Sequence, residues 1–225
     1  MIKKLIVAFS LVFVLFGVAG CGKTINNFVE ENMSEITKDF YFGENDSFYV
    51  TLSVGEREST YLYNGQSTEP VDFALLTLTF KNGSSDSTLE VVLNDGTNSY
   101  DVELLADDMS VGFMADIVNL FDFGETFTLN YEDLSVELTR ISDEFGIDYH
   151  EALNIACENL KEELESQKSY NNFNAECYLR VLREKENSFD NLYWCFTCLD
   201  YEGESFSIVF STVDGKILAK SEENA

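Results

Sequence analysis

Few residues of this chain combine the types and the spacing that catalysis requires. The only histidine, His150, stands at the start of a stretch that reads as a helix, where the helix dipole disfavours a charged imidazole. The sequence has no P-loop, G-x-S-x-G elbow, G-x-G-x-x-G fingerprint or H-E-x-x-H motif. We therefore predict that the protein is not an enzyme and that His150 lies on exposed helix surface.

Acidic residues dominate the charge of the chain. Asp and Glu number 41 against 14 Lys and Arg, which gives a formal net charge of −27 at pH 7. Such a charge repels nucleic acid and anionic polymers, so we expect no nucleic-acid partner. It favours cationic partners, although a solvated surface that keeps the protein soluble is the simpler explanation.

The acidic residues do not form a recognisable ligand set. No loop of the EF-hand pattern occurs, and we predict neither a metal site nor a cofactor. The carboxylates are too numerous to single out a pair for a glycosidase-like hydrolase, which stays a distant alternative.

Four cysteines follow the first one at Cys21: Cys157, Cys177, Cys195 and Cys198. Cys195 and Cys198 form a C-x-x-C inside an aromatic and β-branched run that reads as a strand. Residues i and i+3 of a strand point to opposite faces and lie ~10 Å apart, whereas a disulfide needs Cα atoms within ~7 Å. This spacing favours buried free thiols, and it leaves open a cross-pair such as Cys157 with one strand cysteine.

The first 20 residues read as an export signal. Lys3 and Lys4 precede an apolar run from Leu5 to Phe16, and small residues follow it. The apolar run is shorter than the ~20 residues that a membrane-spanning helix needs. We therefore expect a cleaved signal peptide over residues 1–20.

The end of this signal is more specific. Val18-Ala19-Gly20-Cys21 resembles the lipobox of bacterial lipoproteins. The resemblance implies that the Cys21 thiol receives a diacylglycerol, that the chain is cut before Cys21, and that the new N-terminus is usually acylated, for example with palmitate. Two or more acyl chains hold a protein stably on a bilayer. We expect a protein anchored by lipid on Cys21 at the extracytoplasmic face of the cell membrane.

Residues 21–45 read as a tether or a weak helix, and strand-like runs dominate residues 46–141. These runs cover residues 47–54, 59–63, 72–80, 87–93, 99–105, 126–131 and 135–141, with turn pairs at Asn64-Gly65 and Asn82-Gly83 and a turn at Asn94-Asp95-Gly96. Apolar residues from Val111 to Phe121 recur at helical spacing, so we predict one helix there, with Asp108 or Ser110 as its cap and Gly124 at its end.

Residues 142–225 read as a helix followed by strands. Asp148 can cap the helix, whose apolar stripe is Leu153, Ala156, Cys157, Leu160 and Leu164. Strands are predicted over 175–183, 191–201 and 204–212, with a short final strand from Ile217. Trp194 could line a groove, but a lone tryptophan in a strand usually anchors a core.

This second unit resembles a PepSY-type domain. The resemblance rests on the helix EALNIACENL, the strand with Tyr193-Trp194, a hairpin and the closing VDGKIL. It implies an extracytoplasmic α+β module that binds proteins or peptides, including peptidases, without catalysis.

We therefore expect an α+β protein with an antiparallel β-rich N-terminal region containing one helix and a PepSY-like C-terminal helix plus antiparallel sheet. Its expected function is non-enzymatic binding of a protein or peptide. The alternative is an acidic lipoprotein that binds a small molecule or a cation. An exposed sheet edge would favour the former, and a pocket with converging polar groups the latter.

Overall fold

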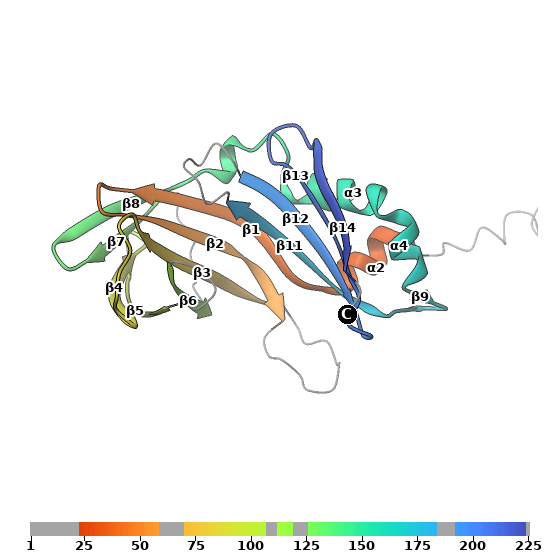
Figure 1. Cartoon of the computed structure of the whole chain (residues 1–225), viewed down its shortest axis with the longest axis horizontal. Helices are drawn as coiled ribbons and strands as arrows, with labels where there is room; N and C mark the ends of the chain where they lie inside the picture. Colours follow the sequence, from red (N-terminus) through yellow and green to blue (C-terminus); the bar gives the residue numbers. More distant parts are fainter. Residues whose placement is uncertain (1–22, 59–69, 107–111, 119–125, 184–191, 224–225) are drawn as a thin grey trace, which may run out of the picture.

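The computed structural model describes residues 23–58, 70–106, 112–118, 126–183 and 192–223. Their strands form one twelve-stranded sheet and a separate two-stranded ribbon, accompanied by three short α-helices and one 3-10 turn (Figure 1). In chain order the elements are α2 (Ile25–Glu31), β1 (Met33–Glu44), β2 (Phe48–Glu58), β3 (Pro70–Phe80), β4 (Thr88–Asn94), β5 (Ser99–Ala106), β6 (Gly112–Val118), β7 (Thr126–Tyr131), β8 (Leu134–Arg140), η1 (Ser142–Glu144), α3 (Tyr149–Asn159), α4 (Lys161–Ser166), β9 (Lys168–Ser169), β10 (Asn172–Phe173), β11 (Ala175–Arg183), β12 (Leu192–Asp200), β13 (Ser205–Ser211) and β14 (Ile217–Glu223).

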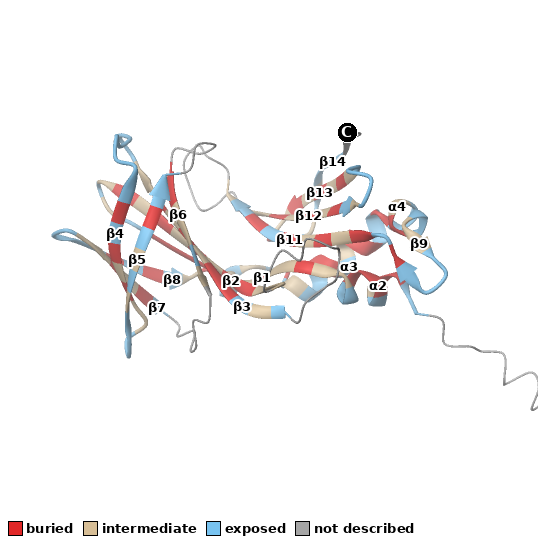
Figure 2. Cartoon of the chain, turned by 90° about the horizontal axis from the view of Figure 1, so that it is seen from below, coloured by how far each residue is buried: buried red, intermediate tan, exposed pale blue. Residues whose placement is uncertain are grey.

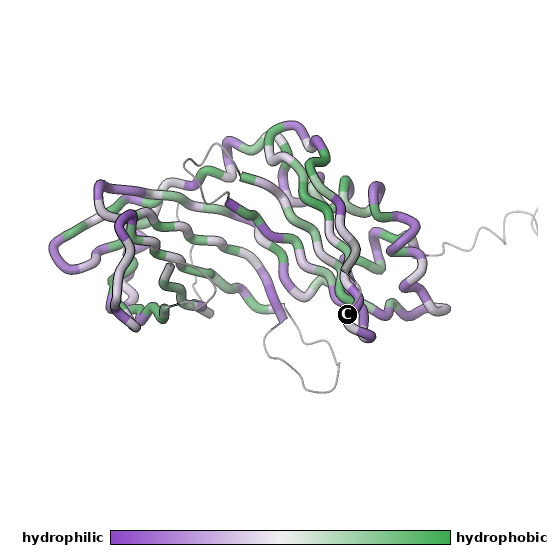
Figure 3. The backbone as a smooth tube through the Cα atoms, viewed as in Figure 1, coloured by the Kyte–Doolittle hydropathy of each residue, from purple (hydrophilic) through white to green (hydrophobic). Residues whose placement is uncertain are grey.

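Eight of the strands close into an antiparallel barrel. Their order is β1-β2-β3-β6-β5-β4-β7-β8, and β8 returns to pair with β1 at Tyr41 and Phe42. Hydrophobic and hydrophilic residues alternate along these strands, because successive side chains point to opposite faces (Figure 3). The inward residues fill the barrel, among them Phe48, Leu52 and Leu76, which are fully buried.

Barrel closure depends on a glycine in β1. A Cβ atom at Gly43 would lie 2.2 Å from the carbonyl oxygen of Glu137 and 2.6 Å from a methyl carbon of Val136, both on β8. Any other residue would therefore push β8 away from β1. Glycine allows this close approach of two backbones.

Four further strands extend the sheet beyond the barrel. The first half of β1 pairs in parallel with β11, and β12, β13 and β14 follow in antiparallel order. Helices α2, α3 and α4 cover one face of this extension, and buried residues recur along both regions of the sheet (Figure 2). The helix-side core contains Trp194, Phe196 and Phe210 from the strands and Leu153 and Leu160 from the helical segment.

The predicted fold class is wrong. The protein is mostly β, with a closed eight-stranded barrel, rather than an α+β protein with a separate PepSY-like helix plus sheet. The C-terminal strands are part of the barrel's own sheet, because β1 pairs with both β2 and β11. The chain leaves the barrel after Arg140, next to the boundary predicted at residues 141–142.

The helix predicted between Val111 and Phe121 is also wrong where the structure describes it. Gly112–Val118 form strand β6, which pairs with β3 and β5. The other strand predictions that fall on described residues are confirmed to within four residues at each end. The turn at Asn94-Asp95-Gly96 is also confirmed, since it joins the paired strands β4 and β5. The Asn82-Gly83 turn follows β3, but β3 and β4 do not pair. The predicted strand at 59–63, the Asn64-Gly65 turn, the caps Asp108 and Ser110, and Gly124 lie outside the described residues.

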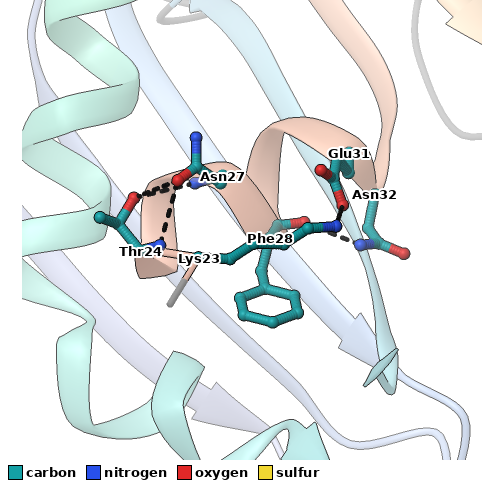
Figure 4. Close-up of polar contacts among 6 residues, drawn as sticks. All are labelled: Lys23, Thr24, Asn27, Phe28, Glu31 and Asn32. Atoms are coloured by element: carbon teal, nitrogen blue, oxygen red, sulfur yellow. Dashed lines mark hydrogen bonds and ion pairs between the residues drawn. The ribbon is translucent and has the colours of Figure 1, made fainter. Parts of the chain in front are cut away.

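The predicted tether or weak helix over residues 21–45 contains a seven-residue helix and a long strand. The Thr24 hydroxyl accepts from the backbone N–H of Asn27, whose side chain accepts in return from the Thr24 backbone N–H, a capping box (Figure 4). Ile25, Phe28 and Val29 are buried in the helix-side core. Helix α2 is therefore an integral part of the helix-side core.

Candidate functional site

A pocket of about 300 Å³ opens where helices α2 and α3 meet the start of the barrel. It lies between the first turn of α3, the end of α2, the first half of β1 and the neighbouring ends of β2 and β3. Its volume is at the lower end of the range for small-molecule sites. The lining residues are Glu30, Met33, Ile36, Lys38, Glu56, Pro70, Tyr149, His150 and Leu153.

Two local features of the chain position these side chains. The register of β1 against β2 shifts between Thr37 and Asp39, which leaves Lys38 as the extra residue of a bulge. Gly55 lies opposite, where a Cβ atom would come within 1.8 Å of the Ile36 carbonyl oxygen. Bulges of this kind re-aim side chains, and here Lys38 points into the pocket.

Helix α3 forms the opposite wall. The Asp148 carboxylate accepts from the backbone N–H of Glu151 at 2.8 Å, which confirms Asp148 as the N-cap. The predicted apolar stripe of this helical segment is buried in the helix-side core. Asn26 of α2 donates through its side chain to Asn154 of α3 at 2.7 Å, which joins the two helices beside the pocket.

The polar groups of the pocket converge on one aromatic ring. The Lys38 ammonium lies 2.5 Å from a Glu56 carboxylate oxygen and 5.8 Å from the centre of the Tyr149 ring. The ring of the next residue, His150, lies beside the Tyr149 ring, with a centroid distance of 4.0 Å and an angle of 33° between the ring planes. The Lys38 and Glu56 side chains are 30% and 41% exposed, so we expect their pair to contribute at most about 1 kcal/mol to stability.

The charge balance of the pocket is negative. Two carboxylates, Glu30 and Glu56, and one ammonium, Lys38, line it. Met33, Ile36 and Leu153 supply an apolar floor that continues into the helix-side core. This combination suits a ligand that carries a positive charge on a short apolar body.

The residues singled out from the sequence have separate places in the structure. Cys21, the predicted lipid-attachment residue, lies outside the described residues. His150 is exposed on the first turn of α3, as predicted, and it lines the pocket. Trp194 is buried, and its indole N–H donates to the carbonyl oxygen of Ile147 at 2.9 Å, so it anchors the core. Lys38 and Glu56 were not predicted, because no sequence signal links them to Tyr149, which lies 111 residues after Lys38 (149 − 38) and 93 after Glu56 (149 − 56).

Carboxyl groups elsewhere in the described chain are stabilised in their ionised form. Hydrogen bonds from Asn98, followed by one from Thr97, lower the pKa of Asp95 to about 2, although burial acts in the opposite direction. Burial, the largest single influence, raises the pKa of Glu163, but the hydrogen bond and charge of Lys220 together with a backbone hydrogen bond outweigh it and leave the pKa lowered. A general acid would need a raised pKa, so Asp95 and Glu163 do not provide one. The described chain also contains no cluster of three or more His, Cys, Asp or Glu side chains that could hold a metal ion.

A second feature is the free edge of the sheet. Strand β14 is the last strand of the sheet and pairs with β13 alone among the described strands. Leu218 is 49% exposed on this strand. Lys220 contacts the Glu163 carboxylate and donates to the Asn159 carbonyl oxygen at 3.3 Å, which fastens β14 to the helical segment.

Comparisons with known proteins do not identify a family. No family model, curated protein or solved structure matches the chain. Within the described ranges, none of the helices has the length and hydrophobicity of a membrane-spanning segment.

Proposed function

We propose that the protein is a lipid-anchored, non-enzymatic binding protein at the extracytoplasmic face of the cell membrane, and that its pocket takes a small amine with a short apolar body. The arrangement of side chains around Tyr149 is the observation that supports an amine as the ligand. The Lys38 ammonium already lies over this ring, and two carboxylates and three apolar side chains line the same pocket.

The predicted lipid-attachment residue, Cys21, is close in sequence to the first residues of the pocket. Cys21 precedes Thr24 by three residues, a length of chain that spans at most ~10 Å. Helix α2 adds about 10 Å at 1.5 Å per residue, and Glu30 and Met33 of the pocket lie at its far end. A lipid on Cys21 would therefore hold the pocket on the order of 20 Å from the bilayer surface.

Three probes of equal shape test the ligand class. Phenethylamine, 2-phenylethanol and phenylpropanoate share one apolar body and carry a positive, a neutral and a negative head. Isothermal titration calorimetry of the full-length protein should rank the amine first, by about tenfold over the alcohol. Equal binding of the three probes, or no binding of the amine, would contradict the proposal.

Two variants separate the roles of the pocket charges. Glu56→Gln should weaken amine binding about tenfold, because it removes a carboxylate and frees the Lys38 ammonium to repel the ligand. Lys38→Met should strengthen amine binding, because the competing cation is lost from the Tyr149 ring. Glu90→Gln on β4, outside the pocket, is the matched control and should leave binding unchanged. A preference for phenylpropanoate that disappears in Lys38→Met would identify Lys38 as an anion anchor instead.

The free edge of β14 favours a second function, the binding of an extended peptide by strand addition. An unpaired edge offers backbone N–H and C=O groups to a new strand, and exposed Leu218 would pack on its alternate side chains. A partner captured from detergent-solubilised membranes should be lost with Leu218→Lys and kept with the control Tyr170→Ala, which changes an exposed residue away from β14. A partner kept by both variants would exclude this edge.

A further inference from the structure

Three cysteines from three elements are buried close to one another in the helix-side core. Cys157 lies on α3, Cys177 on β11 and Cys198 on β12, and each is at most 1% exposed. All cysteines of the described chain are free thiols. Cys195 is half-buried on the opposite face of β12, as the alternation of a strand predicted.

Cys177 and Cys198 occupy directly opposite positions on neighbouring antiparallel strands. The backbone N–H of Cys177 donates to the carbonyl oxygen of Asn32 at 2.9 Å, on the side of β11 away from β12. The two cysteines therefore form a non-hydrogen-bonded pair, in which Cα atoms are ~4.5 Å apart and side chains are closest. This separation lies at the short end of the range that a disulfide spans.

The surroundings of the thiols oppose their ionisation. The Cys198 side chain, followed by burial, raises the pKa of Cys177 well above its ordinary value. Burial raises the pKa of Cys157 to about 12. Thiolate is scarce at these positions in the folded protein, so an oxidant reacts with them most readily while the chain folds.

We propose that Cys177 and Cys198 are a disulfide-forming pair that locks β11 to β12. The oxidant is a small disulfide such as oxidised glutathione. One cysteine thiolate attacks it, forms a mixed disulfide and releases one glutathione; the second cysteine then displaces the other glutathione. One protein S–S bond forms, the two cysteine protons end on two reduced glutathione molecules, and two electrons pass to the oxidant.

Cys157 is less favourably placed than Cys177 or Cys198 to form a disulfide. Cys157 belongs to a helix packed on the sheet, and packed layers lie on the order of 10 Å apart, beyond the ~7 Å limit between Cα atoms. Backbone pairing instead holds Cys177 and Cys198 in register along the whole β11–β12 ladder. This inference does not depend on the pocket or on the lipid anchor.

Refolding in a glutathione buffer tests the pair. The full-length Cys195→Ser variant is unfolded and reduced, then refolded with oxidised and reduced glutathione. Free thiols are then alkylated in denaturant, and the protein is digested without reduction. Mass spectrometry should find the peptide with Cys177 joined to the peptide with Cys198, and Cys157 alkylated. A bond that includes Cys157, or alkylation of Cys177 and Cys198, would overturn the proposal.

The thermal unfolding midpoint provides a second test of the disulfide, which does not depend on recovering the linked peptides. A bond between residues 177 and 198 closes a loop of about twenty residues, which should raise the thermal midpoint by about 5 °C or more on oxidation. The same treatment of Cys177→Ala should leave its midpoint unchanged. Equal midpoints for the oxidised and reduced parent protein would also overturn the proposal.

Discussion

Tyr41 and Phe42 are consecutive residues of β1 whose side chains belong to two different hydrophobic cores. Tyr41 packs inside the barrel, edge to face with Phe127 at 5.0 Å, whereas Phe42 packs in the helix-side core. Both residues are buried because both faces of β1 are covered at this point. Strand β1 thus contributes side chains to both the barrel core and the helix-side core. A substitution that destabilises one core should therefore also destabilise the other.

We expect the two cores to unfold together. Leu76→Ala removes a fully buried side chain from the barrel and should cost roughly 2–5 kcal/mol. Trp194 is the only tryptophan and lies in the helix-side core, so its fluorescence reports on the other half. The urea midpoint followed by Trp194 fluorescence should fall as far as that followed by circular dichroism. A fluorescence midpoint that stays at the parent value would show that the halves unfold independently.

Gly43→Ala should weaken the closure of the barrel. The new methyl group would meet the Glu137 backbone at 2.2 Å, and we expect a loss of roughly 1–3 kcal/mol of unfolding free energy. Gly112→Ala on β6 is the matched control, because its nearest contact is the Thr79 hydroxyl, a side-chain atom that can move. Chemical denaturation of both variants checks the difference, and equal losses would argue against strain at the β1–β8 contact.

Asp95 should stabilise the protein in a pH-dependent way. Its carboxylate accepts from the backbone N–H groups of Thr97 and Asn98 at 2.8 and 2.6 Å in the β4–β5 turn. Because folding lowers its pKa to about 2, its contribution is complete above pH 4 and fades as the pH falls towards 2. Asp95→Asn should cost about 1 kcal/mol at pH 7 and much less at pH 2. Asp101→Asn, which changes an exposed carboxylate on β5, controls for the altered net charge.

Cys21→Ala should abolish membrane association. The lipobox reading of Val18 to Cys21 assigns the diacylglycerol to this thiol, and replacing it by a methyl group removes the attachment atom. Fractionation and mass spectrometry of the N-terminal peptide should find the parent protein lipidated in the membrane fraction. The variant should lack the lipid, and Cys195→Ala should behave as the parent does. A variant that remains uncut and membrane-bound would point to a signal anchor instead.

Local sequence patterns determined most individual elements. The alternation of apolar and polar residues located the strands, and the apolar stripe with Asp148 at its start located α3. The exception at β6 has a clear cause. Phe113, Ala115 and Ile117 alternate as in a strand, but Val111, Met114, Val118 and Phe121 also recur at helical spacing. A short apolar run satisfies both periods, and pairing with β3 decides for the strand.

Only the tertiary structure decided which strands pair. The alternation of side chains says that a strand has a buried face, but it does not name the neighbours on either edge. The pairings β3–β6, β4–β7 and β1–β8 skip along the sequence, so barrel closure could not be predicted from adjacent hairpins. The parallel pairing of β1 with β11, 140 or so residues later, likewise joins the C-terminal strands to the barrel sheet.

The candidate sites also fall into those that local sequence predicts and those that only the tertiary structure forms. The predicted export and lipidation signal from Met1 to Cys21 consists of consecutive residues, because the enzymes that read such signals act on an extended segment. The pocket around Tyr149 and the pair Cys177–Cys198 are made by residues distant in sequence, which packing and strand register bring together. Composition indicated an acidic protein, the missing catalytic motifs led us to expect a non-enzymatic one, and the PepSY resemblance implied binding. The positions that could hold a ligand or a disulfide exist only in the folded chain.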